Sequence, residues 1–197
     1  MKIFFTRRFS REINGIDMSS HLMKKVLHER CGLPSGAEVE KSVHGKPYVD
    51  SSYSIYFSIT DTENMWLCST ADFEHGTDAE YYSRSVSNCT MLAKRFLTES
   101  ERRAVISYGI DDNERSGQFI YLWTRKEAYL KYIGQGLAGL SSAPPVLIPP
   151  KGTDLKTFVF EGLFVSVCAP EGRLPADIDF ICLDRTDRSA KSERDIR

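Results

Sequence analysis

The sequence has no apolar run that approaches the roughly 20 residues needed to span a membrane. It also lacks an excess of charge of either sign, since 26 basic residues oppose 27 acidic ones and leave a formal charge of −1. Such a chain has no global attraction to nucleic acid or to an anionic membrane, and we expect it to bind neither. The first residues, MKIFFTRRFSREI, hold no apolar segment of signal-peptide length, so we expect a cytoplasmic protein.

Cysteine and histidine are too few and too scattered to form a disulfide framework or a zinc site. The cysteines number five, an odd count, and none forms a CxxC pair. Most of them lie among apolar residues, which favours buried, reduced thiols. The four histidines have no metal-ligand spacing either. A charged content of 27% and a hydrophobic content of 41% are typical of a globular chain and argue against disorder.

Hydrophobic periodicity predicts a mixture of strands and helices. Helix ends are marked by an Asp17 cap with Gly32 at the far end, and by a capping box at Thr98–Glu101. Helices are predicted at 21–33, 89–97, 100–107 and 118–133, with a polar loop at 109–118. Strands are predicted at 3–5, 54–60, 65–70, 156–171 and 179–184, and a proline-rich, non-helical segment at 141–152.

The helix predicted at 118–133 carries the sharpest chemical pattern. Trp123, Glu127 and Lys131 follow one another at intervals of four residues and therefore share one stripe. An apolar set on an overlapping face places this stripe at the edge of the core, with Lys126 beside it. The alternative is an exposed Glu–Lys pair, which stabilises a helix by only a few tenths of a kcal/mol.

A second acidic feature is the segment GTDAE at 76–80. In a strand, Asp78 and Glu80 would point to the same side, and their mutual repulsion favours a bound cation. Carboxylates combined with phosphate and water suit Mg²⁺. The alternative is a solvated acidic turn, and the segment ADFE at 71–74 is a competing motif. A third feature is the GKP turn at 45–47, where Lys46 could meet a phosphate.

Taken together, these motifs resemble those of the 4′-phosphopantetheinyl transferases of the surfactin-synthetase-activator type. That family carries GKP, a strand similar to F-N-x-S-H-S, then G-x-D-x-E and W-x-x-K-E-x-x-x-K. This sequence has GKP at 45–47, FSITDT at 57–62, GTDAE at 76–80 and WTRKEAYLK at 123–131. AKRFLTESE and FVSVCAP are also similar to family segments, so the resemblance runs from about 17 to 183. The family's glycine before its aspartate favours GTDAE over ADFE.

The resemblance implies an α+β fold of two similar lobes related by a pseudo-twofold axis, with the active site between them. The N-terminal lobe would span 1–73 and hold GKP and FSITDT. The C-terminal lobe would span 74–197 and hold GTDAE and WTRKEAYLK, with a mobile tail from about residue 184. The family also implies a monomer.

The resemblance further implies an enzyme that transfers the 4′-phosphopantetheine arm of coenzyme A to a serine of an apo acyl or peptidyl carrier protein. Adenosine 3′,5′-bisphosphate would leave, and Mg²⁺ would be required. The implied metal ligands are Asp78, Glu80 and Glu127. Glu127 would also act as general base, and Lys131 would stabilise charge on the diphosphate. The implied contacts to coenzyme A are Lys46, Thr60, Asp61 and Lys126.

One departure from the family motif stands at 60–61, where the family has Ser-His. Thr60 keeps the hydroxyl, but Asp61 places a negative charge where a phosphate is expected, which should weaken coenzyme A binding. Two other functions therefore stay open. One is a degenerate member that binds coenzyme A or a carrier protein without transfer. The other is a metal-dependent phosphohydrolase or nuclease that shares only the acidic cluster.

Overall fold

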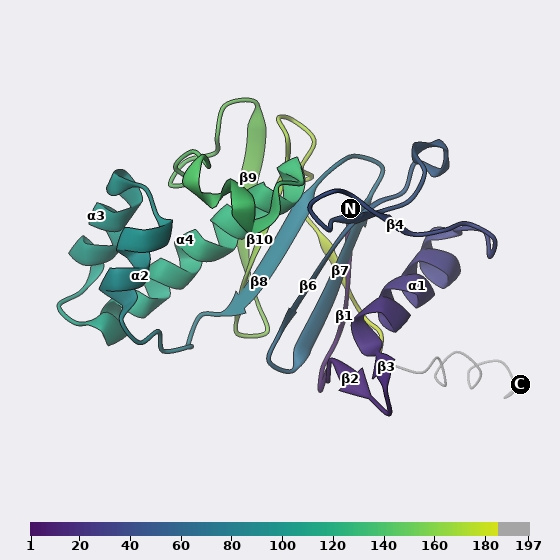
Figure 1. Ribbon diagram of the computed structural model, residues 1–197, viewed down its shortest axis with the longest axis horizontal. Helices are drawn as coiled ribbons and strands as arrows, with labels where there is room; N and C mark the ends of the chain where they lie inside the picture. Colours follow the sequence, from purple (N-terminus) through teal and green to yellow (C-terminus); the bar gives the residue numbers. More distant parts are fainter. Residues whose placement is uncertain (185–197) are drawn as a thin grey trace, which may run out of the picture.

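The computed structural model describes residues 1–184, so the tail expected to be mobile lies outside the described residues apart from Asp184. The fold is a mixed α/β structure with two main sheets (Figure 1). The first sheet has the order β11-β1-β7-β6, in which β1 runs antiparallel to β7 and parallel to β11. Its strands are β1 (Lys2–Thr6), β6 (Tyr56–Thr62), β7 (Met65–Ala71) and β11 (Asp179–Cys182).

Helix α1 (Met18–Cys31) packs against this sheet and begins before the predicted residue 21, but the predicted Asp17 and Gly32 caps are confirmed. The Asp17 carboxylate accepts from the Ser19 and Ser20 amides, and Gly32 closes the helix in the left-handed conformation. Phe57, Trp66 and the apolar face of α1 form a common core. Short ribbons and a 3₁₀ turn complete this half: β2 (Glu12–Ile13), β3 (Ile16–Asp17), β4 (Glu40–Lys41), β5 (Pro47–Tyr48) and η1 (Ser51–Tyr53).

The second sheet has the order β8-β10-β9, and all of its pairings are antiparallel. Its strands are β8 (Gly76–Tyr81), β9 (Thr153–Phe160) and β10 (Leu163–Pro170). Four helical segments belong to this half: α2 (Cys89–Phe96), α3 (Glu99–Tyr108), α4 (Asp112–Ile133) and η2 (Gly136–Ser141). The long helix α4 packs along β8 and β10, as the green ribbon in Figure 1 shows.

The polar loop predicted at 109–118 is wrong, because α4 begins at Asp112. The Asp111 carboxylate caps the helix by accepting from the Asn113 and Glu114 amides at 3.0 Å each. The first turn of α4 is largely exposed and carries no apolar stripe, so the hydrophobic pattern could not reveal it. The capping aspartate was the available signal.

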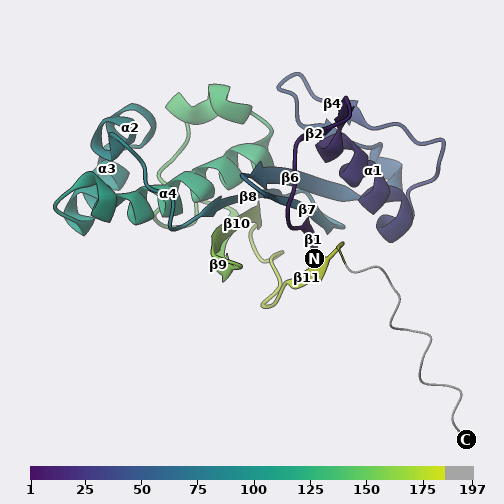
Figure 2. The ribbon, with the colours of Figure 1, turned by 90° about the horizontal axis from the view of Figure 1, so that it is seen from below.

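The two sheets pack against each other through apolar side chains from both. Ile3, Phe5 and Leu67 of the first sheet share a core with Ala79, Val165 and Val167 of the second. Strand β6 lies beside β8, so the sheet edges that carry FSITDT and GTDAE are neighbours (Figure 1). Seen from below, α1 lies toward one side of this layer of strands, and β9 and β11 lie toward the other (Figure 2).

The predicted reduced thiols are confirmed. All five cysteines are free, and Cys68, Cys89 and Cys168 are buried. Burial raises the pKa of each of these three thiols, which keeps them protonated at neutral pH. Within residues 1–184, no helix has the length and apolar character needed to cross a bilayer.

Gly76, the first residue of β8, lies almost in contact with the backbone of α4. A Cβ at this position would lie 2.2 Å from the Ala128 carbonyl oxygen and 2.2 Å from the Tyr132 amide nitrogen. Both are backbone atoms, so no side-chain rotation could relieve the clash. Glycine at this position therefore sets how closely α4 approaches β8.

We expect Gly76→Ala to lower the free energy of unfolding by at least about 1–3 kcal/mol, because overpacking here must push α4 away from β8. Urea unfolding measures this change. Gly117→Ala is the matched control, since a Cβ at this α4 position meets nothing within 4 Å. The control should gain about 0.5–1 kcal/mol from helix propensity. Equal stabilities for the two variants would contradict the close approach.

Candidate functional site

Three of the four motifs, GKP, FSITDT and WTRKEAYLK, contribute residues to one pocket of about 320 Å³, and Asp78 of GTDAE is joined to it through its contact with Lys131. We call it the Lys46–Lys131 pocket. It is lined by the GKP turn, by β6, by the C-terminal part of α4 and by the segment that follows α4. Asp61, Glu127 and Arg11 also line it. Residues far apart in the sequence thus meet here, with cations and carboxylates on the same walls.

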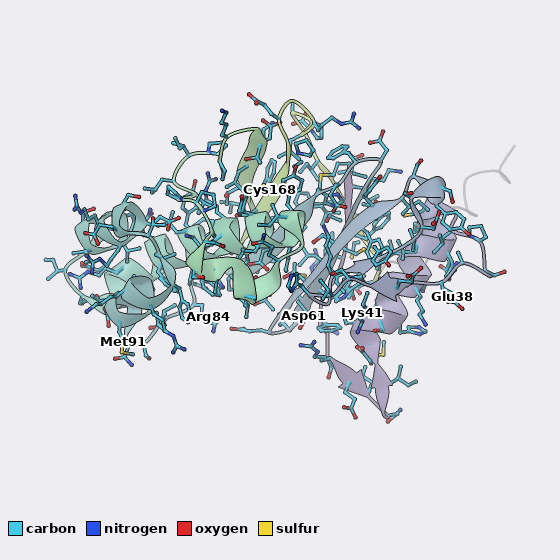
Figure 3. The ribbon with its side chains drawn as sticks, turned by 45° about the horizontal axis from the view of Figure 1, so that its top comes forward. Glu38, Lys41, Asp61, Arg84, Met91 and Cys168 are labelled. Carbon is cyan, nitrogen blue, oxygen red and sulfur yellow. The ribbon has the colours of Figure 1, made fainter. Side chains whose placement is uncertain are left out.

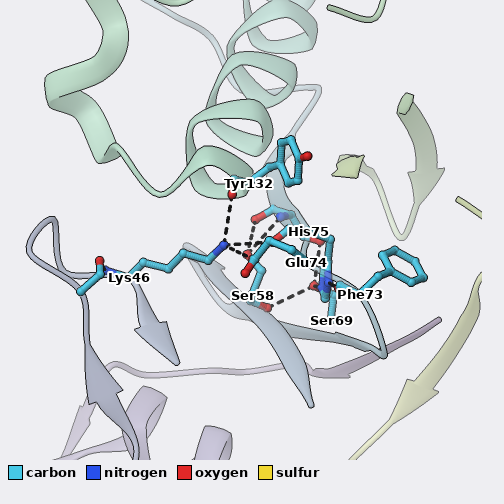
Figure 4. A network of polar contacts seen from close by, with 9 residues as sticks. Lys46, Ser58, Ser69, Phe73, Glu74, His75 and Tyr132 are labelled. Carbon is cyan, nitrogen blue, oxygen red and sulfur yellow. Dashed lines mark hydrogen bonds and ion pairs between the residues drawn. The ribbon is translucent and has the colours of Figure 1, made fainter. Parts of the chain in front are cut away.

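Lys46 reaches from the GKP turn to the second half of the molecule (Figure 4). Its ammonium forms an ion pair with Glu74 and donates to the carbonyl oxygens of His75 at 3.3 Å and Tyr132 at 3.4 Å. The lysine therefore ties the GKP turn to the chain before β8 and to the end of α4. A further hollow of about 310 Å³ adjoins its other side, lined by Tyr48 and Tyr56 among others.

His75 belongs to the buried polar network shown in Figure 4. Its Nε2 lies 2.8 Å from the Ser69 hydroxyl, and its Nδ1 lies 3.0 Å from the Phe73 carbonyl oxygen. Burial lowers the pKa of His75, so the ring stays neutral. This network anchors the turn that leads into β8. The His75 side chain is fully buried, so it has no exposed surface with which to contact a ligand.

Asp78 is buried and is held by two donors on a single oxygen. The Thr60 hydroxyl donates to Oδ1 at 2.9 Å, and the Lys131 ammonium donates to the same atom at 2.8 Å. Lys131 also donates to the Ile59 carbonyl oxygen at 3.3 Å. The second oxygen, Oδ2, is buried and has no hydrogen-bond partner among residues 1–184. An unpaired buried carboxylate oxygen is costly and indicates a missing partner.

Glu80 repeats this arrangement two residues further along β8. Its Oε2 accepts from the Thr62 hydroxyl at 3.0 Å and from the Arg84 guanidinium at 3.1 Å. Burial raises the pKa of Glu80, and the neighbouring charge of Asp78 raises it further. Asp78 and Glu80 therefore lie on one face of β8, as the alternation of a strand requires.

Glu127 lies at the wall of the pocket, on the stripe of α4 that also carries Lys131. Its pKa is raised from an ordinary value of 4.5 to about 7. Burial is the main cause, and the charges of Asp78 and Glu80 add to it while Lys131 opposes it. The three carboxylates predicted as metal ligands thus lie within electrostatic reach of one another.

The donor set fits a divalent cation in its chemistry. Three carboxylates suit Mg²⁺, and the unpartnered Asp78 Oδ2 is a ready ligand atom. As the side chains stand, no three acidic, histidine or cysteine groups within residues 1–184 are arranged to hold a metal ion. The Lys131 ammonium pairs with Asp78 Oδ1 at 2.8 Å and supplies positive charge next to these carboxylates.

Lys126 lies outside this group, and its expected contact with coenzyme A phosphate has no support in the structure. It is fully buried, and its ammonium pairs with Glu101 at 2.7 Å, which is also fully buried. The Glu101 carboxylate accepts from the Thr98 amide at 2.7 Å and from the Val146 amide at 2.8 Å. Being adjacent to Glu127, Lys126 points about 100° away around the helix. Its contacts make it a structural residue of the core.

Other sequence-predicted positions also have clear locations. Trp123 packs between Phe96 and Phe119 in the core around α4. Thr60 does not line the pocket, because its hydroxyl faces Asp78. In the competing acidic motif, Asp72 is exposed and pairs with Arg173 at 3.6 Å. This placement favours GTDAE as the acidic motif of the site.

Asp61 projects into the pocket and has a basic partner that the sequence did not reveal. An Arg11 nitrogen lies 3.8 Å from the Asp61 carboxylate, and both residues line the pocket. Figure 3 places Asp61 near the middle of the molecule and Arg84 on the side of α2. The cluster of arginines near the N-terminus was the only signal for Arg11, and it could not say which one turns inward.

Comparison with known proteins matches residues 74–164 to a sequence model described as the 4′-phosphopantetheinyl transferase superfamily. The predicted resemblance to this superfamily is thereby confirmed. The matched region contains the GTDAE and WTRKEAYLK motifs, and it includes all three carboxylates of the site.

Several curated relatives carry the same name. The chain is 29% identical to 4′-phosphopantetheinyl transferase HetI of Nostoc sp. over 141 residues, which cover 69% of this chain and 58% of the relative. It is 30% identical to gsp of Aneurinibacillus migulanus over 117 residues, covering 59% and 46%. It is 25% identical to Sfp of Bacillus subtilis over 151 residues, covering 70% and 65%. The matched part is thus about half to two thirds of each relative's length.

The raised pKa of Glu127 predicts how stability depends on pH. The folded state binds the Glu127 proton more tightly than the unfolded state does, so stability falls as pH rises from about 4.5 to about 7. Glu127→Gln removes this loss. In metal-free buffer, the stability advantage of the variant should therefore grow by up to about 3 kcal/mol between pH 4.5 and 7.5.

Urea unfolding at several pH values, with a chelator present, measures this advantage. Glu38→Gln removes an exposed carboxylate and serves as the control for the loss of one negative charge. If the stability advantage of Glu127→Gln stayed constant with pH, the pKa of Glu127 in the folded protein would not be raised.

Proposed function

We propose that this protein transfers the 4′-phosphopantetheine arm of coenzyme A to a serine of an apo carrier protein and releases adenosine 3′,5′-bisphosphate. One observation carries the proposal. A glutamate with a pKa near 7, Glu127, and a lysine, Lys131, share the wall of a pocket, next to a buried carboxylate with a free oxygen. A base with a pKa near the working pH suits proton abstraction. The names of the relatives support the same reaction.

The positions of these residues support the following reaction. The serine oxygen attacks the phosphorus next to the pantetheine arm while Glu127 takes the serine proton. The bond from that phosphorus to the bridging oxygen breaks, and its electron pair leaves with the adenosine bisphosphate. Lys131 stabilises the negative charge that develops on the diphosphate. Asp78, Glu80 and Glu127 would hold a Mg²⁺, which supplies charge neutralisation to the diphosphate and its leaving group.

Coenzyme A would lie in the Lys46–Lys131 pocket, with Lys46 as a phosphate contact. Arg11 offers a further cation on the same wall, and its pairing with Asp61 offsets the negative charge there. This pairing explains how the pocket could accept a phosphate even though aspartate replaces the family's histidine. The charge of Lys46 is partly offset by Glu74 in the same way.

We also propose that the fold consists of two lobes related by a pseudo-twofold axis, divided near residues 73–74, with β11 returning to the sheet of the first lobe. The chain order supports this division, since strand, helix and hairpin follow one another in β1–α1–β6–β7 and again in β8–α4–β9–β10. In both sheets the first strand pairs antiparallel with the second strand of the hairpin. The pocket draws residues from both halves, so neither lobe should act alone.

The partners in this proposal are coenzyme A and an apo acyl or peptidyl carrier protein. We also propose a monomer, as the resemblance to the family implies. The cytoplasmic location inferred from the sequence is part of the same proposal.

Incubation of the protein with coenzyme A, Mg²⁺ and an apo carrier protein, followed by mass spectrometry of the carrier, tests this function. The carrier should gain the mass of one phosphopantetheine group. We expect Glu127→Gln to lower this rate by at least about 10²-fold, because the general base and a metal ligand are both lost. Glu38→Gln, which removes an exposed glutamate, should transfer at the wild-type rate.

The other two functions give different results in the same experiment. Binding of coenzyme A without a gain of carrier mass, across several carriers, would identify a protein that binds without transfer. Hydrolysis of unrelated phosphodiesters would identify a metal-dependent phosphohydrolase. Near-normal transfer by Glu127→Gln would show that Glu127 is neither the base nor an essential ligand.

The Arg11–Asp61 pair generates a separate prediction about coenzyme A affinity. Arg11→Ala should weaken binding about two- to fivefold, the range expected of an exposed ion contact. Asp61→Asn should tighten binding more in the Arg11→Ala background than in the wild type, because Arg11 no longer offsets the carboxylate. Isothermal titration with coenzyme A measures all four proteins of this cycle.

Arg8→Ala is the matched control for the loss of a positive charge, since Arg8 is exposed and does not line the pocket. It should leave the affinity unchanged. If Arg8→Ala and Arg11→Ala weakened binding equally, the effect would be one of net charge and the pair would have no specific role.

A further inference from the structure

Two threonines of β6 face two carboxylates of β8 in matched steps. Thr60 donates to Asp78 at 2.9 Å, and Thr62 donates to Glu80 at 3.0 Å. Each pair is two residues along from the other on its own strand, so both contacts lie on the same face of the β6–β8 edge. All four residues are buried or half-buried.

The two contacts also share an atomic pattern. In Asp78, the Thr60 hydroxyl and the Lys131 ammonium both donate to Oδ1. In Glu80, the threonine hydroxyl and the Arg84 guanidinium both take Oε2. Asp78 Oδ2 is buried without a hydrogen-bond partner among residues 1–184, and both side-chain hydrogen bonds that Glu80 makes within that range are accepted by Oε2. Each carboxylate is thus held by one oxygen and leaves the other available to a ligand.

We propose that Thr60 and Thr62 are positioning residues for a divalent cation, which act by fixing the orientation of the Asp78 and Glu80 carboxylates. This inference rests on the proposed function, since it assigns the cation to these carboxylates. Thr60 then has a role different from the coenzyme A contact that the sequence suggested. The cation itself would contact the carboxylates and not the hydroxyls.

The physical reason lies in the freedom of a carboxylate side chain. An unrestrained aspartate or glutamate loses rotamer freedom when it binds a metal, and this loss weakens affinity. A hydroxyl that donates to one oxygen removes that cost in advance, and the branched threonine has a stiff side chain of its own. Groups that orient ligands in this way typically contribute 10- to 100-fold in metal affinity.

Ser58 provides a control on the same strand. It points in the same direction as Thr60 and Thr62, but its hydroxyl contacts the backbone of Thr77, accepting from the amide at 3.0 Å. Its removal should therefore disturb the β6–β8 edge without loosening a carboxylate. Thr60→Ser is the second control, because it keeps the donor hydroxyl.

The test is a titration of the protein with Mn²⁺, followed by electron paramagnetic resonance of the free ion. Mn²⁺ serves as the probe because carboxylate sites that suit Mg²⁺ also suit Mn²⁺. Coenzyme A is present at a saturating concentration, because Ser58 lines the pocket proposed to hold it, and no carrier protein is added, so no turnover occurs. We expect Thr60→Val and Thr62→Val each to lower Mn²⁺ affinity by about 10- to 100-fold. Thr60→Ser should stay within about threefold of the wild type, as should Ser58→Ala, whose hydroxyl touches no carboxylate.

Two results would overturn the proposal. One is an unchanged Mn²⁺ affinity in both valine variants. The other is an equal loss in Ser58→Ala, which would mean that these hydroxyls only maintain the fold. Melting temperatures of all variants, measured without metal, separate a loss of stability from a loss of affinity.

The carrier mass assay on the wild type keeps this proposal distinct from the proposed function. If the wild type modified the carrier but the valine variants kept the wild-type metal affinity, the positioning role of Thr60 and Thr62 would be wrong and the proposed transferase function would stand. A wild type that neither binds Mn²⁺ with coenzyme A present nor modifies a carrier would sink both.

Discussion

The close approach of helix α4 to the first residue of β8 is the constraint on which the site depends. Gly76 has no side chain, so the backbone of α4 at Ala128 and Tyr132 can lie directly against the strand. Two residues further along β8, Asp78 then comes within hydrogen-bond distance of Lys131. A larger residue at the start of the strand would separate Glu127 and Lys131 from the acidic face of β8.

Neighbouring residues of α4 show two opposite ways of burying charge. Lys126 and Glu101 neutralise each other, and the remaining acceptor capacity of Glu101 is used by backbone amides, so this pair is complete. Glu127, one residue along, is buried near two other carboxylates, and its pKa rises in consequence. The Lys126–Glu101 ion pair therefore stabilises the core. Glu127, whose charge is not neutralised in this way, keeps the capacity to bind a cation or to exchange a proton.

The sequence predicted the features that depend on local chemistry. The ends of α1 follow from Asp17 and Gly32, and the glutamate of the Thr98–Glu101 capping box does reach back to the N-cap amide. The alternation that placed Asp78 and Glu80 on one face is also local. The start of α4 was missed because its first turn is largely exposed and carries no apolar stripe.

Features that depend on packing between distant segments could not be predicted. Lys126 and Lys131 both flank Glu127 in the sequence, and only the tertiary packing shows that one faces the core and the other the pocket. The partnership of Arg11 with Asp61 joins segments fifty residues apart. The spacing of residues along the sequence does not indicate which distant segments contact each other in the fold.

The last described strand has a consequence for how the molecule can move. β11 comes after the second sheet in the chain, yet it pairs with β1 of the first sheet from Lys2 opposite Asp179 to Phe5 opposite Cys182. The two halves are therefore fastened by the short connection before β8 and by this returning strand. A wide opening of the two halves would have to break the hydrogen-bonded pairing between β1 and β11. We therefore expect ligands to enter through shifts of loops and side chains, with the two sheets staying joined.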